Sequence, residues 1–287
     1  MKNSIASHLQ TEPAINIELH AKNPIFLIFA AFWHTLRRDI TVTFREFIPF
    51  LMQVLVSPFA MLLVFGRALP GMGTMNQVYP SEFLPGVVAL TIFLASMVGI
   101  TVSLMLDLDY AREIDDRLLA PMPVSLIAIE KVIFSTLRSL VAGALIFPLA
   151  HWVLGGGYQV RTDMLVPLIA IMVLSSLTTS ALGLVIGAAL PADKLYMIFS
   201  VIFTVTLYTG CVFYTWTSIS AIKVFQIITL CNPVTYVAEG LRSVMVPPTN
   251  GQAFPALPIG WTWLGLSAFF LFFLIIGIRT FRKRVIS

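Results

Sequence analysis

The chain of 287 residues is 58% hydrophobic and 11% charged, with a mean hydropathy of +0.91 and a net charge of +4 at pH 7. This composition excludes a soluble globular protein, in which charged residues usually make up about a quarter of the chain. The apolar runs are continuous rather than alternating, which favours membrane-spanning helices over a β-barrel. The basic residues cluster at the ends of these runs, which indicates membrane orientation and not nucleic-acid binding.

Residues 1–23 are polar and lack the apolar core of a signal peptide, and we expect a mobile cytoplasmic tail. A helix is predicted at 24–45, where Phe29 and Trp33 fall near one face and Arg37 and Arg38 on the other. This pattern is typical of a helix that lies in the membrane interface. The alternative is a plain helical extension of the first span.

Six apolar runs with almost no charge follow, each long enough to cross a bilayer, which takes about 20 residues. The chain is therefore expected to be an all-α, multi-pass membrane protein with spans at 47–66, 83–106, 126–154, 164–190, 195–216 and 261–278. If the N-terminus is inside, the inner segments hold thirteen Lys and Arg residues and the outer segments four. This asymmetry places both termini, including a basic tail at 279–287, on the cytoplasmic side of a plasma (inner) membrane.

The segment between the second and third spans, Asp107–Pro123, holds seven of the chain's 32 charged residues. A short helix is predicted at 109–120, stopped by Pro121 and Pro123. We interpret it as a docking surface for a soluble partner, the alternative being a solvated loop. The charged residues expected at this surface are Arg112, Glu113, Asp116 and Arg117.

Residues 217–258 are predicted to form a re-entrant helical hairpin on the outer side. The apolar helix at 224–230 is too short to span, and Asn232-Pro233 begins a second helix, because Pro fits the first turn. Glu239 and Arg242 stand three residues apart on that helix, where they form either a local ion pair or part of a gate. Two cysteines, Cys211 and Cys231, are either small apolar fillers or a disulfide.

The motifs of several site types are absent from the sequence. There is no GxxxxGK[ST] phosphate loop, no HExxH zinc motif and no GxSxG elbow, and we expect no enzyme site and no cofactor in this chain. The predicted spans hold almost no ionisable residue, which argues against an ion-coupled carrier and for an external energy source. The exceptions lie in the third run, where Glu130 and Lys131 stand near the inner end and Arg138 stands two turns further on. Arg138 is interpreted as a structural charge that faces a partner helix or reaches toward the inner surface.

Three features in order resemble the permease subunit of a type-2 ATP-binding-cassette exporter, a family that exports drugs, glycolipids and polysaccharides. The first is the interface helix before the first span. The second is Arg112-Glu113 followed by the run Leu118–Ser125, although no Gly follows the Arg-Glu pair as it often does in the family. The third is the motif before the last span, formed by Asn232, Pro233, Thr235, Tyr236, Glu239 and Arg242.

The resemblance implies that two copies of the chain, or one copy and a close homologue, pair in the membrane. In each copy, Arg37 and Arg38 of the interface helix would contact a separate ATPase subunit, which binds ATP and Mg²⁺. The helix at 109–120 would contact the same subunit. The motif residues of the hairpin, from Asn232 and Pro233 through Tyr236 to Glu239 and Arg242, would form an outer gate.

The substrate class is predicted from the aromatic residues of the fifth span, which include Phe199, Phe203 and Tyr208. Aromatic side chains suit a drug-like or lipid-like amphiphile, and they would equally stack on sugars, so a glycolipid or polysaccharide exporter is the alternative. Aromatic residues that only pack against neighbouring helices or face lipid would give the same sequence pattern. A self-contained channel or secondary carrier is the rival from another class.

Overall fold

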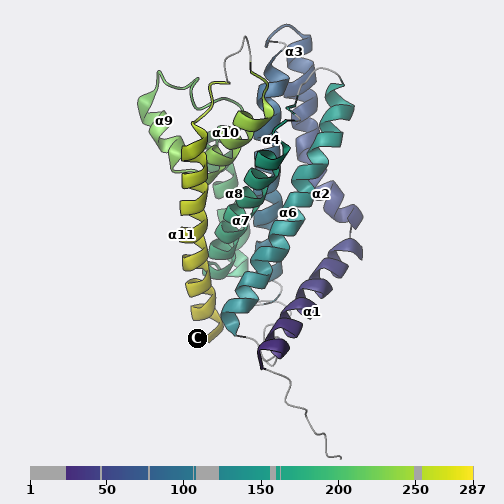
Figure 1. The fold of residues 1–287 in the computed structure, drawn as a ribbon, viewed down its shortest axis with the longest axis vertical. Helices are drawn as coiled ribbons and strands as arrows, with labels where there is room; N and C mark the ends of the chain where they lie inside the picture. Colours follow the sequence, from purple (N-terminus) through teal and green to yellow (C-terminus); the bar gives the residue numbers. More distant parts are fainter. Residues whose placement is uncertain are drawn as a thin grey trace, which may run out of the picture.

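The computed structural model of the protein describes residues 24–45, 47–76, 78–105, 107, 123–155, 160–161, 163–248 and 254–286. Within these ranges the regular secondary structure is helical, and the long helices lie side by side along the long axis (Figure 1). Five helical segments are long and apolar enough to cross a membrane: Ile48–Gly71, Tyr79–Met105, Val124–Leu154, Leu165–Ala189 and Ile259–Val285. The chain is thus an all-helical, multi-pass membrane protein.

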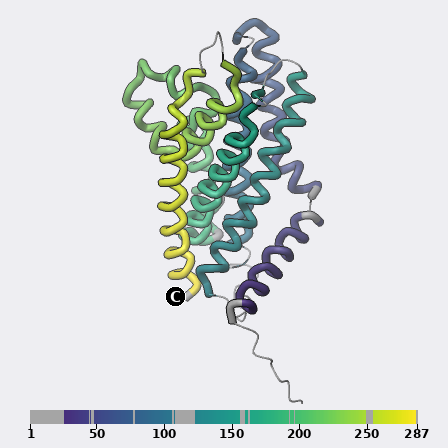
Figure 2. Tube along the Cα trace, in the orientation of Figure 1, coloured from purple at the N-terminus to yellow at the C-terminus, as the bar shows by residue number. Residues whose placement is uncertain are grey.

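Two ends of the bundle serve as landmarks. The C-terminus and α1 (Pro24–Arg45) lie at one end, which we name the C-terminal end, and α3 (Leu69–Gly71) and α9 (Lys223–Leu230) lie at the other, the α3 end (Figures 1 and 2). The first membrane segment begins beside the end of α1 and runs to the α3 end (Figure 1). It is built from α2 (Phe47–Met61), a π-helical turn (Leu62–Ala68) and α3, and therefore ends five residues later than predicted.

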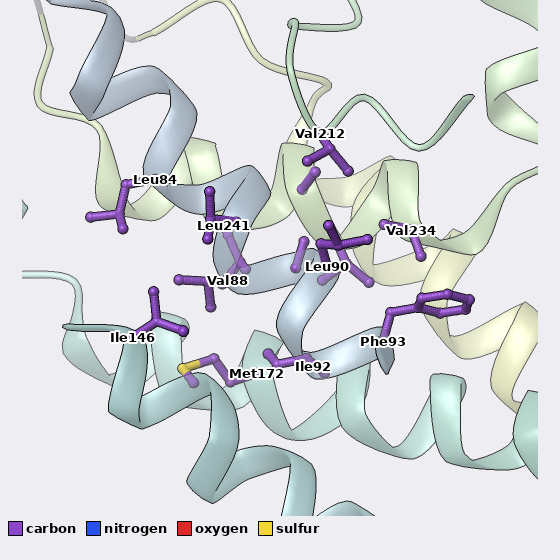
Figure 3. Close-up of a cluster of buried hydrophobic side chains, with 14 of the residues drawn as sticks. Leu84, Val88, Leu90, Ile92, Phe93, Ile146, Met172, Val212, Val234 and Leu241 are labelled. Atoms are coloured by element: carbon purple, nitrogen blue, oxygen red, sulfur yellow. The ribbon is translucent and has the colours of Figure 1, made fainter. Parts of the chain in front are cut away.

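The core of the bundle is formed by α4 (Tyr79–Met105), α6 (Val124–Leu154) and α7 (Leu165–Ala189). α4 is central, because it packs against α6, α7 and α10 (Pro233–Met245). Figure 3 shows Leu90 and Phe93 of α4 among buried side chains from these neighbours. These helices match the second, third and fourth predicted spans to within four residues at each end.

Small residues allow α4 and α7 to approach closely. A Cβ atom on Gly183 would lie 2.3 Å from Cγ2 of Ile100, and one on Gly187 would lie 2.9 Å from Cδ1 of Leu104. The two glycines form a GxxxG pattern, which brings helix backbones together in membranes. Buried hydroxyls link the same helices, since Thr179 donates to Ser96 Oγ over 2.9 Å. Packing and hydrogen bonds together fix this part of the bundle.

The predicted fifth span, 195–216, differs from the structure. Its helix, α8 (Ala192–Thr209), ends seven residues early, and the segment up to α9 contains only turns and bends. Gly210 caps α8, and Cys211 has a φ of 51°, which no α-helix accommodates. The disulfide alternative is wrong, because Cys211 and Cys231 are both free.

The last helix, α11 (Ile259–Ile286), extends well beyond the predicted span, and its last turns cover most of the predicted basic tail. It packs along α7. Arg284 explains part of the extension, because its Nη1 donates to the carbonyl oxygens of Gly187 and Leu190 over 3.0 and 2.7 Å. Those carbonyls lie where α7 ends, and a basic side chain stabilises such groups.

Helix α1 has the predicted bounds and leans away from the bundle at the C-terminal end (Figure 1). Its buried face is narrow. Leu36 is buried and Phe32 packs against the core, whereas Phe29 and Trp33 are 66% and 56% exposed. The exposed aromatic side chains point away from the protein, as an interfacial helix requires.

Candidate functional site

Two buried charge networks, one near each end of the bundle, form the candidate site. The first, near the α3 end, is built on α10. Glu239 and Arg242 are almost fully buried, and Nη1 of Arg242 lies 2.8 Å from Oε1 of Glu239. The backbone N–H groups of Trp216 and Leu257 each donate to the Glu239 carboxylate over 3.0 Å. The carboxylate therefore links α10 to the segments that follow α8 and precede α11.

Arg242 extends this network to α4. Its Nε donates to the carbonyl oxygen of Glu82 and its Nη2 to that of Val212, both over 3.0 Å. The Val212 carbonyl sits directly on Gly86, where a Cβ would lie 2.1 Å from the oxygen. The ion pair predicted from the i, i+3 spacing is present, and it joins four segments of the fold instead of standing on an exposed helix.

The other residues of the predicted hairpin motif shape the start of α10. Asn232 caps the helix by accepting from the N–H of Val234 over 3.0 Å, and Pro233 takes the first turn. The amide of Asn232 also donates to Thr209 Oγ1 at the end of α8 over 2.8 Å. Tyr236 leans on α11, where its ring covers Gly265. The motif residues thus lie on α10 or cap it, and they connect this short helix to α8, α4 and α11.

The second network lies at the C-terminal end and was not predicted. Lys131 of α6 is 1% exposed, and its Nζ lies 2.9 Å from Oδ2 of Asp39 on α1 and 2.9 Å from Oδ2 of Asp107. The same Nζ donates to Ser103 Oγ of α4 over 2.6 Å. A buried ammonium with two carboxylate partners satisfies its charge and hydrogen bonds. This cluster ties α1 to the bundle core.

The predicted docking residues divide between described and undescribed parts of the chain. Arg37 and Arg38 are both exposed on α1, and Arg38 also pairs with Asp39 over 3.3 Å. The helix predicted at 109–120, with Arg112, Glu113, Asp116 and Arg117, lies outside the described residues. It begins two residues after Asp107 of the Lys131 cluster.

The aromatic residues predicted to line a substrate path occupy three environments. Phe199 lines a small cavity of about 80 Å³ that Arg138 and Gln53 share. Phe203 packs against the core cluster, and Tyr208 is 62% exposed. The structure therefore brings only Phe199 next to polar groups inside the bundle.

Arg138, the charge predicted within a span, lies on α6 and does face a partner helix. It donates to Oε1 of Gln53 on α2 over 3.2 Å, and its guanidinium carbon lies 4.7 Å from the centre of the Phe50 ring. Within the described residues, no group of three or more His, Cys, Asp or Glu side chains is placed to hold a metal ion.

The comparison with family models decides the identity. The model described as ABC-2 type transporter matches residues 30–246, which run from α1 through α10. The chain belongs to the ABC-2 type transporter family. A comparison with curated proteins returned no match. As an ABC-2 permease, the chain is a membrane component that pairs with an ATP-binding-cassette subunit.

The match covers all charged residues of both networks in this ABC-2 permease, whereas Leu257, whose N–H donates to Glu239, lies beyond it. Sequence reasoning found the Glu239 network, because both of its charges stand on one helix. It missed the Lys131 cluster, whose members come from separate segments. The signal that could have found it is the occurrence of Asp39, Asp107 and Lys131 beside apolar runs, since such charges are buried only when paired.

Proposed function

We propose that the chain is the permease subunit of an exporter that moves a drug-like or lipid-like amphiphile from the cytoplasm or inner leaflet outward, powered by a separate ATPase. The observation that carries this proposal is the ion pair between Lys131 and Asp39. It joins α1, which exposes Arg37 and Arg38, to the core helix α6. A push on α1 by a docked ATPase would therefore reach the bundle through a fixed link.

The C-terminal end is proposed to face the cytoplasm. Basic residues support this orientation, because α1, the start of α8 and the last turns of α11 all carry them at that end, whereas the α3 end carries few. Positive charge is retained on the cytoplasmic side of membranes. In this orientation the Glu239 network lies near the outer face, where the α9–α10 hairpin would act as the predicted gate.

A sixth span is proposed at α8. Its 18 residues extend over about 27 Å at 1.5 Å per residue, close to the thickness of the hydrocarbon layer. With α8 in the membrane, α1 and the C-terminus fall on the same side. This agrees with their common place at one end of the bundle (Figure 1).

A second copy of the chain is the proposed partner within the membrane. Helix α2 exposes Ile48, Met52 and Val56 at intervals of four residues, and α8 exposes Met197, Val201 and Val205 in the same way. Both rows are apolar stripes on single helix faces. A dimer built on these faces would enclose a path that Phe199 could reach.

The test is reconstitution of the purified permease in liposomes with and without its ATPase subunit. Stimulation of ATP hydrolysis by a panel of drugs, lipids and glycolipids would identify the substrate class. Outward movement that requires both subunits and ATP supports the exporter. Stimulation by glycolipids alone would favour the glycan alternative, and movement without ATP would favour a channel or secondary carrier.

A further inference from the structure

A cavity of about 800 Å³ opens between α1, α2, α4 and α6, at the place where α1 leans away from the bundle. Its volume falls within the range of small-molecule sites in proteins. Arg38 lines it from α1, Gln53 from α2 and Arg138 from α6, and the Lys131 cluster forms one of its walls. The cavity is therefore bordered by several charged side chains beside apolar helices.

The charges of this cavity favour an anionic guest. Among the described residues that line it, three are basic (Arg38, Lys131 and Arg138) and two are acidic (Asp39 and Asp107). Both carboxylates lie 2.9 Å from Lys131, and a cationic guest would have to compete with that ammonium. One hydrogen bond of Arg138 goes to the neutral amide of Gln53 in the cavity wall. The planar guanidinium of an arginine can donate two parallel hydrogen bonds to a phosphate or carboxylate.

An apolar cavity of about 230 Å³ adjoins the first and shares Phe50, Phe134 and Arg138 with it. Apart from Thr43 and Arg138, the residues that line it are apolar. Leu137 and Val141 of its wall are 43% and 46% exposed, so this cavity borders the surface that faces lipid. An alkyl chain could therefore enter from the membrane while its polar end stays in the larger cavity.

We propose that these two cavities bind an amphiphile with an anionic headgroup, a phosphate or a carboxylate. The headgroup is held by Arg138 and Arg38, and the alkyl chain lies between Phe134, Leu137 and Val141. If the ligand is the transported substrate, this inference rests on the proposed exporter function and narrows its substrate class. If it is a resident membrane lipid, the site stands without that function.

Binding is tested on the full chain in neutral dodecyl maltoside by titration calorimetry, with dodecyl phosphate as the probe and dodecyltrimethylammonium as its cationic counterpart. We expect dodecyl phosphate to bind at least about tenfold more tightly than the cation, and Arg138→Gln to lower its affinity at least about tenfold. Arg138→Lys should restore part of the affinity, because the charge returns without the planar fork. Equal affinity for both probes, or an unchanged affinity in Arg138→Gln, would overturn the site.

Two further variants test whether binding depends on this site or on positive surface charge in general. Arg38→Gln changes a 52% exposed side chain, which does not endanger folding, and should weaken binding severalfold. Arg282→Gln removes an equally basic, exposed side chain from α11 and should leave the affinity unchanged. A loss in Arg282→Gln as large as that in Arg138→Gln would mean that dodecyl phosphate responds only to surface charge, which contradicts the proposal.

A second arm of the experiment distinguishes the two sources of the ligand. The permease and its ATPase are reconstituted in vesicles that contain a fluorescent lysophosphatidic acid. ATP-dependent movement that Arg138→Gln abolishes identifies a substrate, whereas Arg138-dependent binding without movement identifies a resident lipid, and both support the site. Because binding is measured on the permease alone, failure of ATP-driven transport leaves that result intact. Probe binding that does not depend on Arg138 or Arg38 refutes the proposal.

Discussion

Lys131 of α6 lies 2.9 Å from Asp39 of α1, although 92 positions separate them in the chain. Asp107 completes the cluster, and it is the first residue of the charged segment in which the sequence predicts a docking surface. One buried ammonium therefore connects α1, the core helix α6 and the first residue of this segment. The arrangement makes Lys131 the residue through which movement of α1 would be transmitted.

Replacement of Lys131 by Met should destabilise the protein strongly, because Asp39 and Asp107 would remain buried without their cation. Removing one partner of a buried ion pair costs about 3–5 kcal/mol. Asp39→Asn should cost less, since Lys131 keeps Asp107 at 2.9 Å. Thermal unfolding of the purified variants in detergent measures the order. A greater loss in Asp39→Asn than in Lys131→Met would contradict the shared role of the two carboxylates.

Arg242→Met should lower stability by a similar amount, about 3–5 kcal/mol, because it leaves the buried Glu239 carboxylate without a cation. The matched control is the exposed pair of Arg161 and Asp163, in which Nη2 of the arginine lies only 2.6 Å from Oδ2 of the aspartate. Breaking this pair leaves no fully buried charge without a partner. Asp163→Asn should therefore not change the unfolding temperature measurably. Comparable losses at both pairs would show that burial does not determine the strength of the Arg242 network.

Gly183→Val should separate α7 from α4, because even a Cβ atom would meet Ile100 at 2.3 Å. Overpacking of this kind costs about 1–3 kcal/mol. Gly260→Ala serves as the control, since nothing lies within 4 Å of its added Cβ. Unfolding in detergent and trypsin cleavage of the detergent-solubilised protein should both report the difference. If Gly183→Val unfolds like the unchanged protein, the close approach of α4 and α7 is not required.

Charge reversal at Arg112 or Glu113 should lower the substrate-stimulated ATP hydrolysis of the reconstituted complex, because these residues are predicted to contact the ATPase. Membrane insertion and the amount of protein should stay unchanged. Reversal at Lys223, which is exposed on α9 at the α3 end, provides the control. Full stimulation in the Arg112 and Glu113 variants would remove both residues from the docking surface.

The sequence predicted those features that depend on local patterns. Helix α1 begins at Pro24 as expected, and α10 begins where Asn232-Pro233 supplies a cap and a first turn. The length of each charge-free run predicted most of the spans. The end of α8 was misjudged, because the apolar residues after Thr209 pack in turns, and an apolar composition does not distinguish a buried turn from a helix.

The Lys131 cluster and the close contact at Gly86 were not predicted, because both depend on segments that lie far apart in the sequence. The Lys131 cluster draws on α1, α4, α6 and Asp107, and nothing in the local sequence of any of these segments specifies the other three. The same holds for Gly86, whose requirement for close approach arises from the Val212 carbonyl far along the chain. Local spacing indicated Glu239 and Arg242 only because helix geometry brings residues three apart together.

The most direct test of the proposed function measures outward movement of an amphiphile in liposomes that contain the permease, its ATPase subunit or both. We expect movement only when both subunits and ATP are present, and a strong reduction when Lys131→Met or a docking variant replaces the unchanged permease. Movement at the full rate with the permease alone and no ATP would contradict the proposed function.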